Sequence, residues 1–401
     1  MLRAPKRILL SVPHMGGTEF RYVQEAFDTN WLSTVGPNLA ELEKTFESLV
    51  GWPSVALSSG TSGLHLALRA VGIRPGEEVI AQSLTFVAST NPILQEHARP
   101  ILIDSDRATW NIDPNLLSEF LSRRARENRL PRAVMVVHLF GQPASIDDLL
   151  GICAKYEITL IEDAAESLGS RYRGRHPGTF GHIGVYSFNG NKMITGTTGG
   201  MLVTQDPALA ARVRHWSTQA RDPDPSGINN YIHTEHGYNY RMSNVIAGIV
   251  RGQLEVLPKR VCQRRAIFER YRQALADIPG IEPQPDLPGA TPGPESGLVP
   301  EDATFHSRWL SCFLVDESKF GMSAPELIRY LELANVESRP VWRPMHVQPL
   351  FARAERIGGQ VAEDLNRRGI CLPSSSSLSD ADHQFVVDTV RSAYHSRAAG
   401  Y

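Results

Sequence analysis

One lysine, Lys192, lies in a stretch of glycines, asparagines and small hydroxyl residues, YSFNGNKMITGTTGG (residues 186–200). Small residues let a ligand approach the backbone closely, and the lysine then supplies either a charge for a phosphate or a nucleophilic amine. The phosphate-binding loop GxxxxGK[ST] is excluded, because Asn191 precedes the lysine and Met193 follows it. The stretch alone favours a third interpretation, an ordinary solvent-exposed lysine.

A carboxylate at a strand end gives this lysine a chemical context. The segment IEDAAES places Asp163 directly after an apolar run that is typical of a β-strand. A lysine and an aspartate are the two side chains that pyridoxal phosphate requires, because lysine forms a Schiff base with it and aspartate pairs with its pyridinium nitrogen. Taken alone, Asp163 is explained equally well as the N-cap of a helix.

The phosphate of such a cofactor would bind at the start of a helix, where backbone N–H groups are free. The segment SSGTSGLHLAL (58–68) opens an amphipathic helix with small residues. Gly60 leaves space there, and the hydroxyls of Thr61 and Ser62 can donate hydrogen bonds. Ser187 supplies a further hydroxyl close to the lysine in the sequence. These residues are therefore candidates for a phosphate site.

The remaining candidates are one aromatic residue, the histidines and the cysteines. Phe86 in SLTFVAST has a ring that fits against a flat heterocycle, although an aromatic residue near a strand end more often belongs to the core. The histidines, His138 and His346 among them, lack HExxH spacing, and the four cysteines lie far apart without a CxxC pair. The sequence therefore predicts no metal site and no disulfide framework.

The elements that position these residues follow from the hydrophobic pattern. Residues 54–205 alternate helical periods with short β-rich runs, namely SVALSSG, EEVIAQS, PILIDSD, RAVMVVHLFG, ITLIEDAAES, IGVYSFN and GGMLVTQD. This alternation predicts a mostly parallel sheet with helices on both faces. Ligands bind at the carboxyl ends of the strands in such sheets. We therefore expect residues 59–62, His138, Asp163 and the stretch after Val185 to line one crevice.

A second, smaller unit is expected towards the C-terminus, because 401 residues exceed the roughly 250–300 at which one core stops growing. A long helical pattern starts with N-cap chemistry at Ser243 and Asn244 and should be interrupted at Pro258. Residues 283–303 are rich in proline, glycine and acidic residues and are predicted to form an exposed insert. The segments RWLSCFLVD, SAPELIRYLELA and GICLP then indicate a small α+β unit.

Composition excludes several classes of partner. The formal net charge is −2, which argues against electrostatic binding to nucleic acid or to an anionic membrane. No apolar run reaches the roughly 18 residues of a membrane helix. The N-terminal run ILLSV is too short for a signal peptide and ends at a proline, so a first strand or an extended arm is expected. These features predict a soluble, cytoplasmic protein.

Several blocks in order along the chain resemble the DegT/DnrJ/EryC1/StrS family of sugar aminotransferases. The blocks include NWLSTVGP, LSSGTSGLHLALRAVGIRPGEEVI, VHLFGQPASID, IEDAAESLGSRYRGRHPGTFGHIGVYSFNGNKMITGTTGGMLVT and GYNYRMSNVIAGIVRGQLEVLPKRV. The resemblance implies the α/β, aspartate-aminotransferase-like fold type I. It predicts a large pyridoxal-phosphate-binding domain, residues 1–250, with an N-terminal arm and a mostly parallel seven-stranded sheet. A smaller C-terminal α+β domain, residues 251–401, is expected to follow.

The resemblance also implies a role for each candidate residue. Lys192 becomes the Schiff-base lysine and Asp163 the pyridinium partner, while Glu166 lies near the phenolic oxygen of the cofactor. Asn239 in GYNYRM matches an asparagine that reaches the phosphate of the neighbouring subunit. A homodimer with shared active sites is therefore implied. The remaining cofactor contacts implied are the phosphate ligands Gly60, Thr61, Ser62 and Ser187 and the stacking ring of Phe86.

The loop SFNGNKMIT (187–195), together with RPVWRPMHVQP (339–349), resembles most the branch that aminates C4 of UDP-4-keto-6-deoxy-N-acetylhexosamines, as in bacillosamine synthesis. The implied amino donor is L-glutamate, which becomes 2-oxoglutarate. Substrate contacts are expected from Arg339, Trp342, His346 and Ser33. Alternatives are amination at C3, a dTDP- or GDP-linked keto-sugar in secondary-metabolite or O-antigen synthesis, or a non-catalytic regulator that binds pyridoxal phosphate. Family members that are dehydratases carry histidine at the lysine position, so the lysine favours transamination.

Two features depart from the family pattern. The loop TGTTGG replaces a more glycine-rich version, and the insert at 283–303 is longer than usual. Neither removes a cofactor residue, but both are expected to reshape the substrate pocket.

Overall fold

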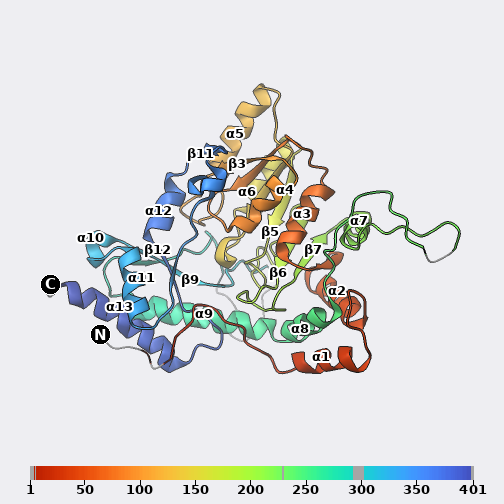
Figure 1. The fold of residues 1–401 in the computed structure, drawn as a ribbon. Helices are drawn as coiled ribbons and strands as arrows, with labels where there is room; N and C mark the ends of the chain where they lie inside the picture. The colour runs from red at the N-terminus through yellow and green to blue at the C-terminus, as the bar shows by residue number, and fades with distance from the viewer. Residues whose placement is uncertain (1–3, 5, 228–229, 292–301, 399–401) are drawn as a thin grey trace.

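The computed structural model describes residue 4 and residues 6–227, 230–291 and 302–398, and it contains two β-sheets joined by a long helical segment (Figure 1). Within these residues the larger sheet has eight strands in the order β1-β7-β6-β5-β4-β2-β3-β11, and the smaller has four in the order β10-β12-β9-β8. The strands are β1 (Ser54–Leu57), β2 (Glu78–Gln82), β3 (Arg99–Ile103), β4 (Ala133–Val137), β5 (Thr159–Asp163), β6 (Ile183–Ser187), β7 (Gly200–Thr204), β8 (Ile281–Pro283), β9 (Ser311–Val315), β10 (Arg339–Pro340), β11 (Glu355–Ile357) and β12 (Gly369–Leu372).

Helices cover both sheets and form the connection between them. The α-helices are α1 (Glu19–Asp28), α2 (Pro37–Val50), α3 (Gly60–Ala70), α4 (Asn91–Gln95), α5 (Pro114–Arg126), α6 (Ile146–Lys155), α7 (Pro207–Ser217), α8 (Asn244–Glu255), α9 (Leu257–Ala274), α10 (Glu317–Phe320), α11 (Ala324–Leu333), α12 (Gln360–Arg368) and α13 (Asp380–Ala398). Short 3-10 turns are η1 (Val87–Ser89), η2 (Leu139–Gly141), η3 (Met345–Val347) and η4 (Pro349–Phe351).

The large sheet is mostly parallel and is buried on both faces, as the strand pattern predicts. Strands β2 to β6 run parallel, whereas β7 runs antiparallel to both β6 and β1. Within β4, Val134 and Val136 pack in one core cluster with residues of α5 and α6. Ala133 and Met135 pack on the opposite face with residues of α3 and α7. The carboxyl ends of β1 to β6 consequently meet at one edge of the sheet.

All seven predicted strands of this sheet are present, and an eighth joins them at the edge. Strand β11 pairs in parallel with β3, with Glu355 opposite Ile101. It has only three residues, which is too short for its pattern to indicate a strand. Next to it, Asp104 accepts hydrogen bonds from the backbone N–H groups of Gly359 and Ala362 at the start of α12. The domain boundary at residue 250 remains a prediction. Strand β11 lies beyond that boundary in the sequence but belongs to the first sheet.

The smaller unit is α+β, as predicted. Its antiparallel sheet packs against α9, α11 and α13 through a core that includes Phe313, Ile370, Leu327 and Val387. The N-terminal segment crosses this unit as an extended arm, because the N–H of Ile8 donates to the carbonyl of Asn335 at 3.0 Å. The expectation of an arm is therefore confirmed.

The predicted interruption of the long helix is confirmed, but one of its two predicted caps is not. Helix α8 ends at Glu255 and α9 starts at Leu257, with Pro258 in its first turn. Ser243 caps α8 by accepting a hydrogen bond from Ile246 N. Asn244 instead bonds the start of α2 and the carbonyl of Trp31. Its side chain therefore anchors the neighbouring segment and does not cap α8.

The predicted exposed insert, residues 283–303, is described only in part, since residues 292–301 lie outside the described residues. Gln284 and Leu287 are buried, which differs from the prediction. The side chain of Gln284 hydrogen-bonds to His306, and Leu287 packs with Ile146 and Tyr172. The start of this segment therefore belongs to the packed structure, because its apolar and amide side chains find partners there.

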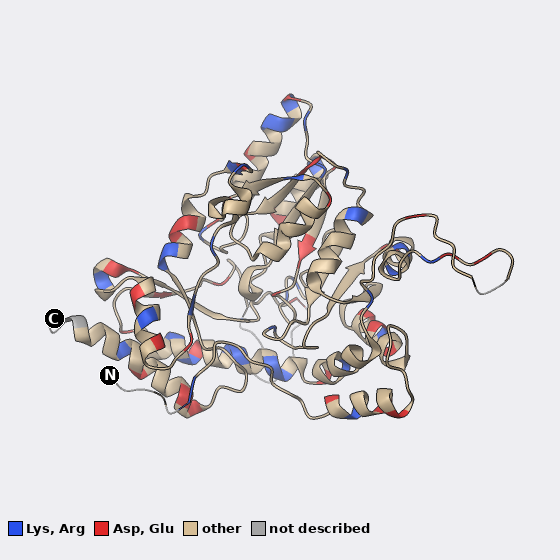
Figure 2. Cartoon of the chain, viewed as in Figure 1, with Lys and Arg blue, Asp and Glu red and all other residues tan. Residues whose placement is uncertain are grey.

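Charged residues of both signs are interspersed along the helices in Figure 2. In the described part of the chain, no helix combines the length and apolar character needed to cross a membrane. The described residues also contain no group of three or more His, Cys, Asp and Glu side chains arranged to hold a metal ion.

Candidate active site

A cavity of about 270 Å³ opens at the carboxyl edge of the large sheet, between this sheet and residues of the smaller unit. It brings together the ends of β5 and β6, the start of α3 and the loop that carries Lys192. Its lining residues are Ser59, Gly60, Thr61, Leu64, Thr85, Phe86, Ala88, Ser89, Val137, Asp163, Ala165, Glu166, Ser187, Asn189, Asn191, Lys192, Thr198, Gly199, Trp309 and Trp342. The expected common crevice therefore exists, but two of the residues expected in it, Ser62 and His138, are not among its lining residues.

Among the described residues that line this cavity, Lys192 is the only one with an ammonium or guanidinium side chain. Its side chain is 12% exposed, and Nζ lies 3.5 Å from Glu166 Oε1 and 4.0 Å from the centre of the Trp309 indole. The loop turns sharply here, because Lys192 N donates to the carbonyl of Asn189 at 3.0 Å. The interpretation as a solvent-exposed surface lysine is therefore wrong.

Asp163 ends strand β5 with its carboxylate buried in the cavity wall. Oδ2 accepts a hydrogen bond of 2.7 Å from Ser89 Oγ, and Oδ1 accepts one from Ala165 N at 3.1 Å. Burial raises the pKa of Asp163, an effect that these hydrogen bonds and the positive charge of Lys192 oppose. The residues after Asp163 form turns and not a helix, so the N-cap interpretation is wrong.

Glu166 is the second buried carboxylate of the site. Oε2 accepts a 2.7 Å hydrogen bond from the backbone of Phe140, while Oε1 faces Lys192. Burial raises the pKa of Glu166, and the nearby Lys192 opposes this shift. Asp163 and Glu166 are thus two buried carboxyl groups whose raised pKa values are opposed by the same cation, Lys192. Such a pair suits a further positively charged or proton-donating group.

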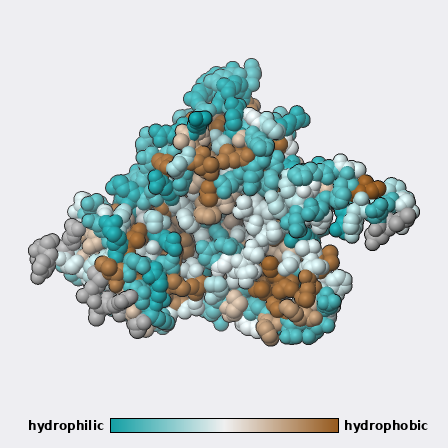
Figure 3. Space-filling view, viewed as in Figure 1, coloured by the Kyte–Doolittle hydropathy of each residue, from teal (hydrophilic) through white to brown (hydrophobic). Residues whose placement is uncertain are grey.

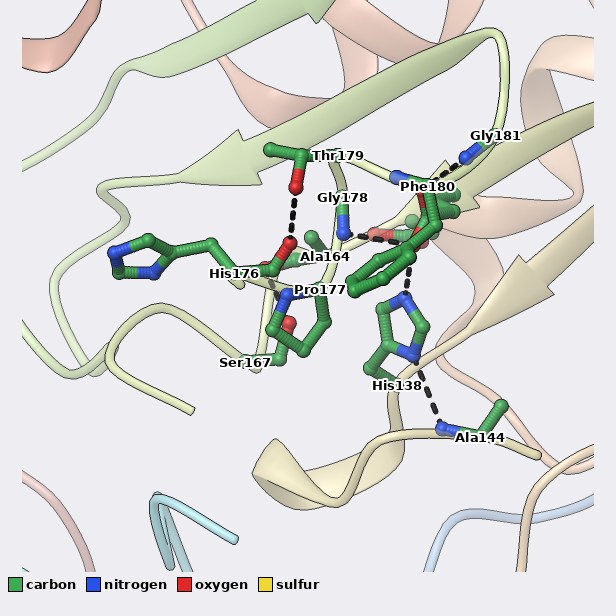
Figure 4. A network of polar contacts seen from close by, with 12 residues as sticks. His138, Ala144, Ala164, Ser167, His176, Pro177, Gly178, Thr179, Phe180 and Gly181 are labelled. Carbon is green, nitrogen blue, oxygen red and sulfur yellow. Dashed lines mark hydrogen bonds and ion pairs between the residues drawn. The ribbon is translucent and has the colours of Figure 1, made fainter. Parts of the chain in front are cut away.

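A second network holds strand β5 from its other face (Figure 4). Glu162 is fully buried and accepts hydrogen bonds from His138 Nε2 and from the backbone N–H groups of Gly178, Phe180 and Gly181. His138 Nδ1 accepts from Ala144 N, so the proton of the neutral ring is on Nε2. His138 therefore does not enter the cavity. Its role is to fix the strand end that carries Asp163.

The start of α3 forms the predicted turn of small residues, but not all of these residues face the cavity. Ser59 and Ser62 form a capping box in which each side chain bonds the backbone N–H of the other. The hydroxyl of Ser62 is thereby used inside the helix start, and Ser62 is not among the cavity-lining residues. Gly60 and Thr61 do line the cavity, and a Cβ on Gly60 would lie 3.1 Å from Ser187 Cβ.

Aromatic rings form one side of the cavity. Phe86 is 51% exposed at the rim, and its ring centre lies 5.5 Å from that of Trp342. Trp342 in turn lies 5.7 Å from Phe140, which stacks at 6.4 Å on Trp309 next to Lys192. Trp342 is therefore at the cavity, as predicted. The cavity-lining rings of Trp342 and Trp309 are thus connected through Phe140, which is buried and does not itself line the cavity.

Four other predicted residues lie outside the cavity in this chain. Arg339 is exposed and pairs with Glu337, and Ser33 is exposed with its carbonyl bonded to Asn244 N. His346 is bonded to Ser83 Oγ at 2.6 Å and Glu363 Oε1 at 3.0 Å, with only 2% of its side chain exposed. This pairing ties the segment after Trp342 to the end of β2. The fourth, Asn239, does not line this chain's cavity.

The sequence reasoning missed two residues that contact the central side chains. Ser89 follows Phe86 by one helical turn, so the segment SLTFVAST offered a weak signal for it. Trp309 is separated from Lys192 by more than a hundred positions, and no local pattern indicates that the two meet. Both were found only from the packing.

Comparison with known proteins agrees with this geometry. Residues 13–391 match the DegT/DnrJ/EryC1/StrS aminotransferase family. EpsN of Bacillus subtilis, whose name provisionally assigns it as a pyridoxal phosphate-dependent aminotransferase, is 42% identical over 395 residues, covering 97% of this chain and 96% of EpsN. GDP-perosamine synthase of Caulobacter vibrioides is 35% identical over 382 residues, covering 95% and 96% of the two chains.

Among solved structures, the aminotransferase TlmJ from Streptoalloteichus hindustanus has a TM-score of 0.86 and 29% sequence identity, covering 98% of this chain and 100% of TlmJ. The fold-type-I architecture expected from the resemblance is therefore present. With the lysine-bearing cavity and the match over nearly the whole chain, the protein belongs to the DegT/DnrJ/EryC1/StrS aminotransferase family.

Proposed function

We propose that this chain is a pyridoxal-phosphate-dependent aminotransferase that transfers the amino group of L-glutamate to a nucleotide-linked 4-keto-6-deoxy sugar. The observation that carries the proposal is the cavity in which the amine of Lys192 lies with the buried carboxylates of Asp163 and Glu166 and the open N-terminus of α3. Family membership and the names of the relatives support the same activity.

The residues present fit pyridoxal phosphate. The buried Asp163 carboxylate can pair with a protonated ring nitrogen, because its described hydrogen bonds come only from Ser89 and Ala165 and leave acceptor capacity. Gly60, Thr61 and Ser187 would hold the phosphate at the start of α3. Phe86 would cover the ring, and Lys192 would bind the cofactor covalently through Nζ. Bound there, the cofactor supplies an electron sink and carries the amino group between substrates.

The chain's own residues supply proton transfer and orientation. Lys192 Nζ takes the proton from the donor carbon as a neutral amine and returns a proton to the acceptor carbon as an ammonium, so one base serves both half-reactions. Burial raises the pKa of Asp163, and the hydrogen bond from Ser89 opposes this shift and so favours the carboxylate, which would pair with a protonated ring nitrogen. Glu166 Oε1 lies 3.5 Å from Nζ and can pair with it. The cavity-lining rings of Trp309 and Trp342 would limit the access of water to these groups.

The nucleotide and the position of amination belong to the proposal. The residues around Lys192 and residues 339–349 favour a UDP-linked 4-keto-6-deoxy-N-acetylhexosamine. A second candidate is a GDP-linked keto-sugar, which is favoured by the relative named GDP-perosamine synthase. Because the ring centre of Trp342 lies 5.5 Å from that of Phe86, Trp342 would pack close to the cofactor and the sugar. Amination at C3 is the remaining alternative.

We include a homodimer with shared active sites in the proposal. Asn239 lies between Tyr238 and Tyr240, whose rings stack at 4.9 Å, and it pairs with Thr218 directly after α7. The segment that follows α7 projects from the body (Figure 1). A projecting segment of this kind is able to reach a second subunit. Apolar surface gathers around α1 and the segment after it (Figure 3). The exposed residues there are Met15, Phe20, Phe27, Trp31, Leu32 and Val35. Such a patch is typical of a protein interface.

The first experiment tests the cofactor. The protein reconstituted with pyridoxal phosphate should absorb visible light, and borohydride reduction should attach the cofactor to the peptide that contains Lys192. Lys192→Ala should show neither result. A colourless parent protein after reconstitution would contradict the proposal.

The second experiment tests the substrate. UDP-, dTDP- and GDP-linked keto-sugars are each supplied with L-glutamate, and 2-oxoglutarate release is followed. Product NMR distinguishes C3 from C4 amination. Cofactor binding without 2-oxoglutarate release on any sugar would favour the non-catalytic regulator instead. A cytoplasmic location also stays a prediction, which fractionation of the producing cells would check.

A further inference from the structure

We propose that Trp309 is a positioning residue that seats the side-chain amine of Lys192 and favours its protonated state. The proposal rests on the proposed role of Lys192 as the proton-transferring amine, and it adds a residue to which neither the sequence pattern nor the family resemblance assigned a role.

Trp309 contacts the lysine at two levels. Its indole Nε1 donates a 2.7 Å hydrogen bond to the carbonyl of Asn191, the residue directly before Lys192. Its ring centre lies 4.0 Å from Lys192 Nζ. One side chain therefore holds both the backbone that carries the lysine and the reacting amine at its end.

The indole cannot turn freely in this position. Trp309 is 1% exposed and stacks against Phe140 with an angle of 30° between the rings. Arg264 of α9, itself fully buried, donates a 2.6 Å hydrogen bond to the carbonyl of Trp309. Its other terminal nitrogen donates to Ser11 Oγ, and Ser11 Oγ donates to the same Asn191 carbonyl at 2.8 Å. The N-terminal arm, α9 and the Trp309 segment thus all donate hydrogen bonds to the backbone carbonyls of Asn191 and Lys192.

The position of Lys192 Nζ over the Trp309 ring favours one charge state of the amine. The face of an indole attracts a cation and has little attraction for a neutral amine. The charged groups that face Lys192 are Glu166 and Asp163, which follow β5, and Arg264, which reaches the Lys192 carbonyl at 3.5 Å. The two carboxylates and the ring favour the ammonium form, while the guanidinium opposes it. Removing the ring changes this balance in one direction, towards the neutral amine.

The test uses the cofactor-free protein, in which the Lys192 amine can be titrated directly. The rate of acylation of Lys192 is measured against pH by mass spectrometry of its peptide in the parent, Trp309→Leu and Trp309→Phe. We expect the midpoint of Trp309→Leu to fall by about one pH unit and that of Trp309→Phe to fall by less, because phenyl attracts cations more weakly than indole. Ser11→Ala is the matched control, since it removes the other hydrogen bond to the Asn191 carbonyl and leaves the ring intact. Its midpoint should equal that of the parent.

Equal midpoints in the parent and Trp309→Leu would overturn the proposal. An equal shift in Ser11→Ala would also overturn it, because the anchoring of the loop and not the ring would then be the cause. Circular dichroism checks folding. If Trp309→Leu does not fold, a parent-like midpoint in Trp309→Phe, which keeps most of the ring volume, is the contradicting result. Failure of the proposed function is seen separately, because the parent would then lack the Lys192-dependent visible absorption whatever the midpoints are.

Discussion

Ser89 Oγ donates a 2.7 Å hydrogen bond to Oδ2 of Asp163, and both side chains are buried in the cavity wall. Burial raises the pKa of Asp163, and the hydrogen bond from Ser89 is the largest of the effects that oppose this shift. The hydrogen bond therefore favours the carboxylate that a protonated ring nitrogen needs. It also orients that carboxylate, because Oδ1 is held by the backbone of Ala165.

Replacing Asp163 by Asn should leave cofactor binding detectable but slow the glutamate half-reaction by ~10²–10³-fold, because a buried charge that stabilises the reacting system is removed.

Ser89→Ala should lower the rate of the same half-reaction about tenfold, the size expected for the loss of one hydrogen bond to a charged group. Single-turnover absorbance changes after glutamate addition measure both rates. A Ser89→Ala rate equal to that of the parent would show that the hydroxyl is dispensable.

Gly200 allows the TGTTGG loop to approach the start of α3 closely. A Cβ on Gly200 would lie 2.5 Å from the carbonyl carbon of Ser59 and 2.6 Å from the backbone nitrogen of Gly60. Gly200→Ala must therefore displace the start of α3, and we expect the dissociation constant of pyridoxal phosphate to rise by at least about tenfold. Gly190→Ala is the matched control in the same loop, since its nearest neighbour is Thr197 O at 3.8 Å. Fluorescence titration of both variants measures the affinities, and equal values would contradict the prediction.

Glu162 should give the protein a pH-dependent part of its stability. Burial alone would raise the pKa of Glu162, but hydrogen bonds from His138 and from the backbone of Gly181 and Gly178 outweigh burial, and the pKa is lowered. A carboxyl group with a depressed folded-state pKa stabilises the protein above its unfolded-state pKa, and this contribution is lost as the pH falls through the folded-state pKa.

Glu162→Gln should therefore reduce the free energy of unfolding near neutral pH by about 3 kcal/mol, because the amide leaves buried donors unpaired. The difference from the parent should shrink as the pH falls below the folded-state pKa, where the parent is protonated too. Asp163 and Glu166, whose pKa values are raised, have the opposite pH dependence but are common to both proteins. Urea unfolding at several pH values measures the difference, and a constant difference would contradict the prediction.

Shared active sites should be detectable by mixing inactive subunits. If Asn239 acts in the cavity of the other subunit, Lys192→Ala and Asn239→Ala chains that are unfolded and refolded together should regain activity. A random mixture of equal amounts would restore about a quarter of the sites, because half of the dimers are mixed and each has one intact site. Either variant refolded alone is the control. No gain on mixing would show that both residues serve the same subunit's site.

Much of the fold could be predicted from local patterns. The seven short apolar runs and the helical period of α3 were sufficient to predict a mostly parallel sheet with Asp163 and the Lys192 loop at one edge, because the carboxyl ends of parallel strands meet there. Strand β11 could not be predicted, because three residues carry no period and the strand exists only through its pairing with β3. Gln284 and Leu287 were predicted to be exposed for a similar reason, since their partners His306, Ile146 and Tyr172 lie far away in the sequence.

The candidate site shows the same difference between what local sequence patterns predict and what long-range packing decides. The sequence alone establishes which residue types are available, and it places Lys192, Asp163 and the Gly60–Thr61 turn on elements that converge, since residue type and local period act over a few positions. Only the tertiary structure decides that the lysine side chain is mostly buried, that Trp309 and Ser89 contact Lys192 and Asp163, and that His346 and Arg339 are engaged elsewhere. The physical reason is that these contacts join residues far apart in the chain, and they form only when complementary side chains pack as whole elements come together.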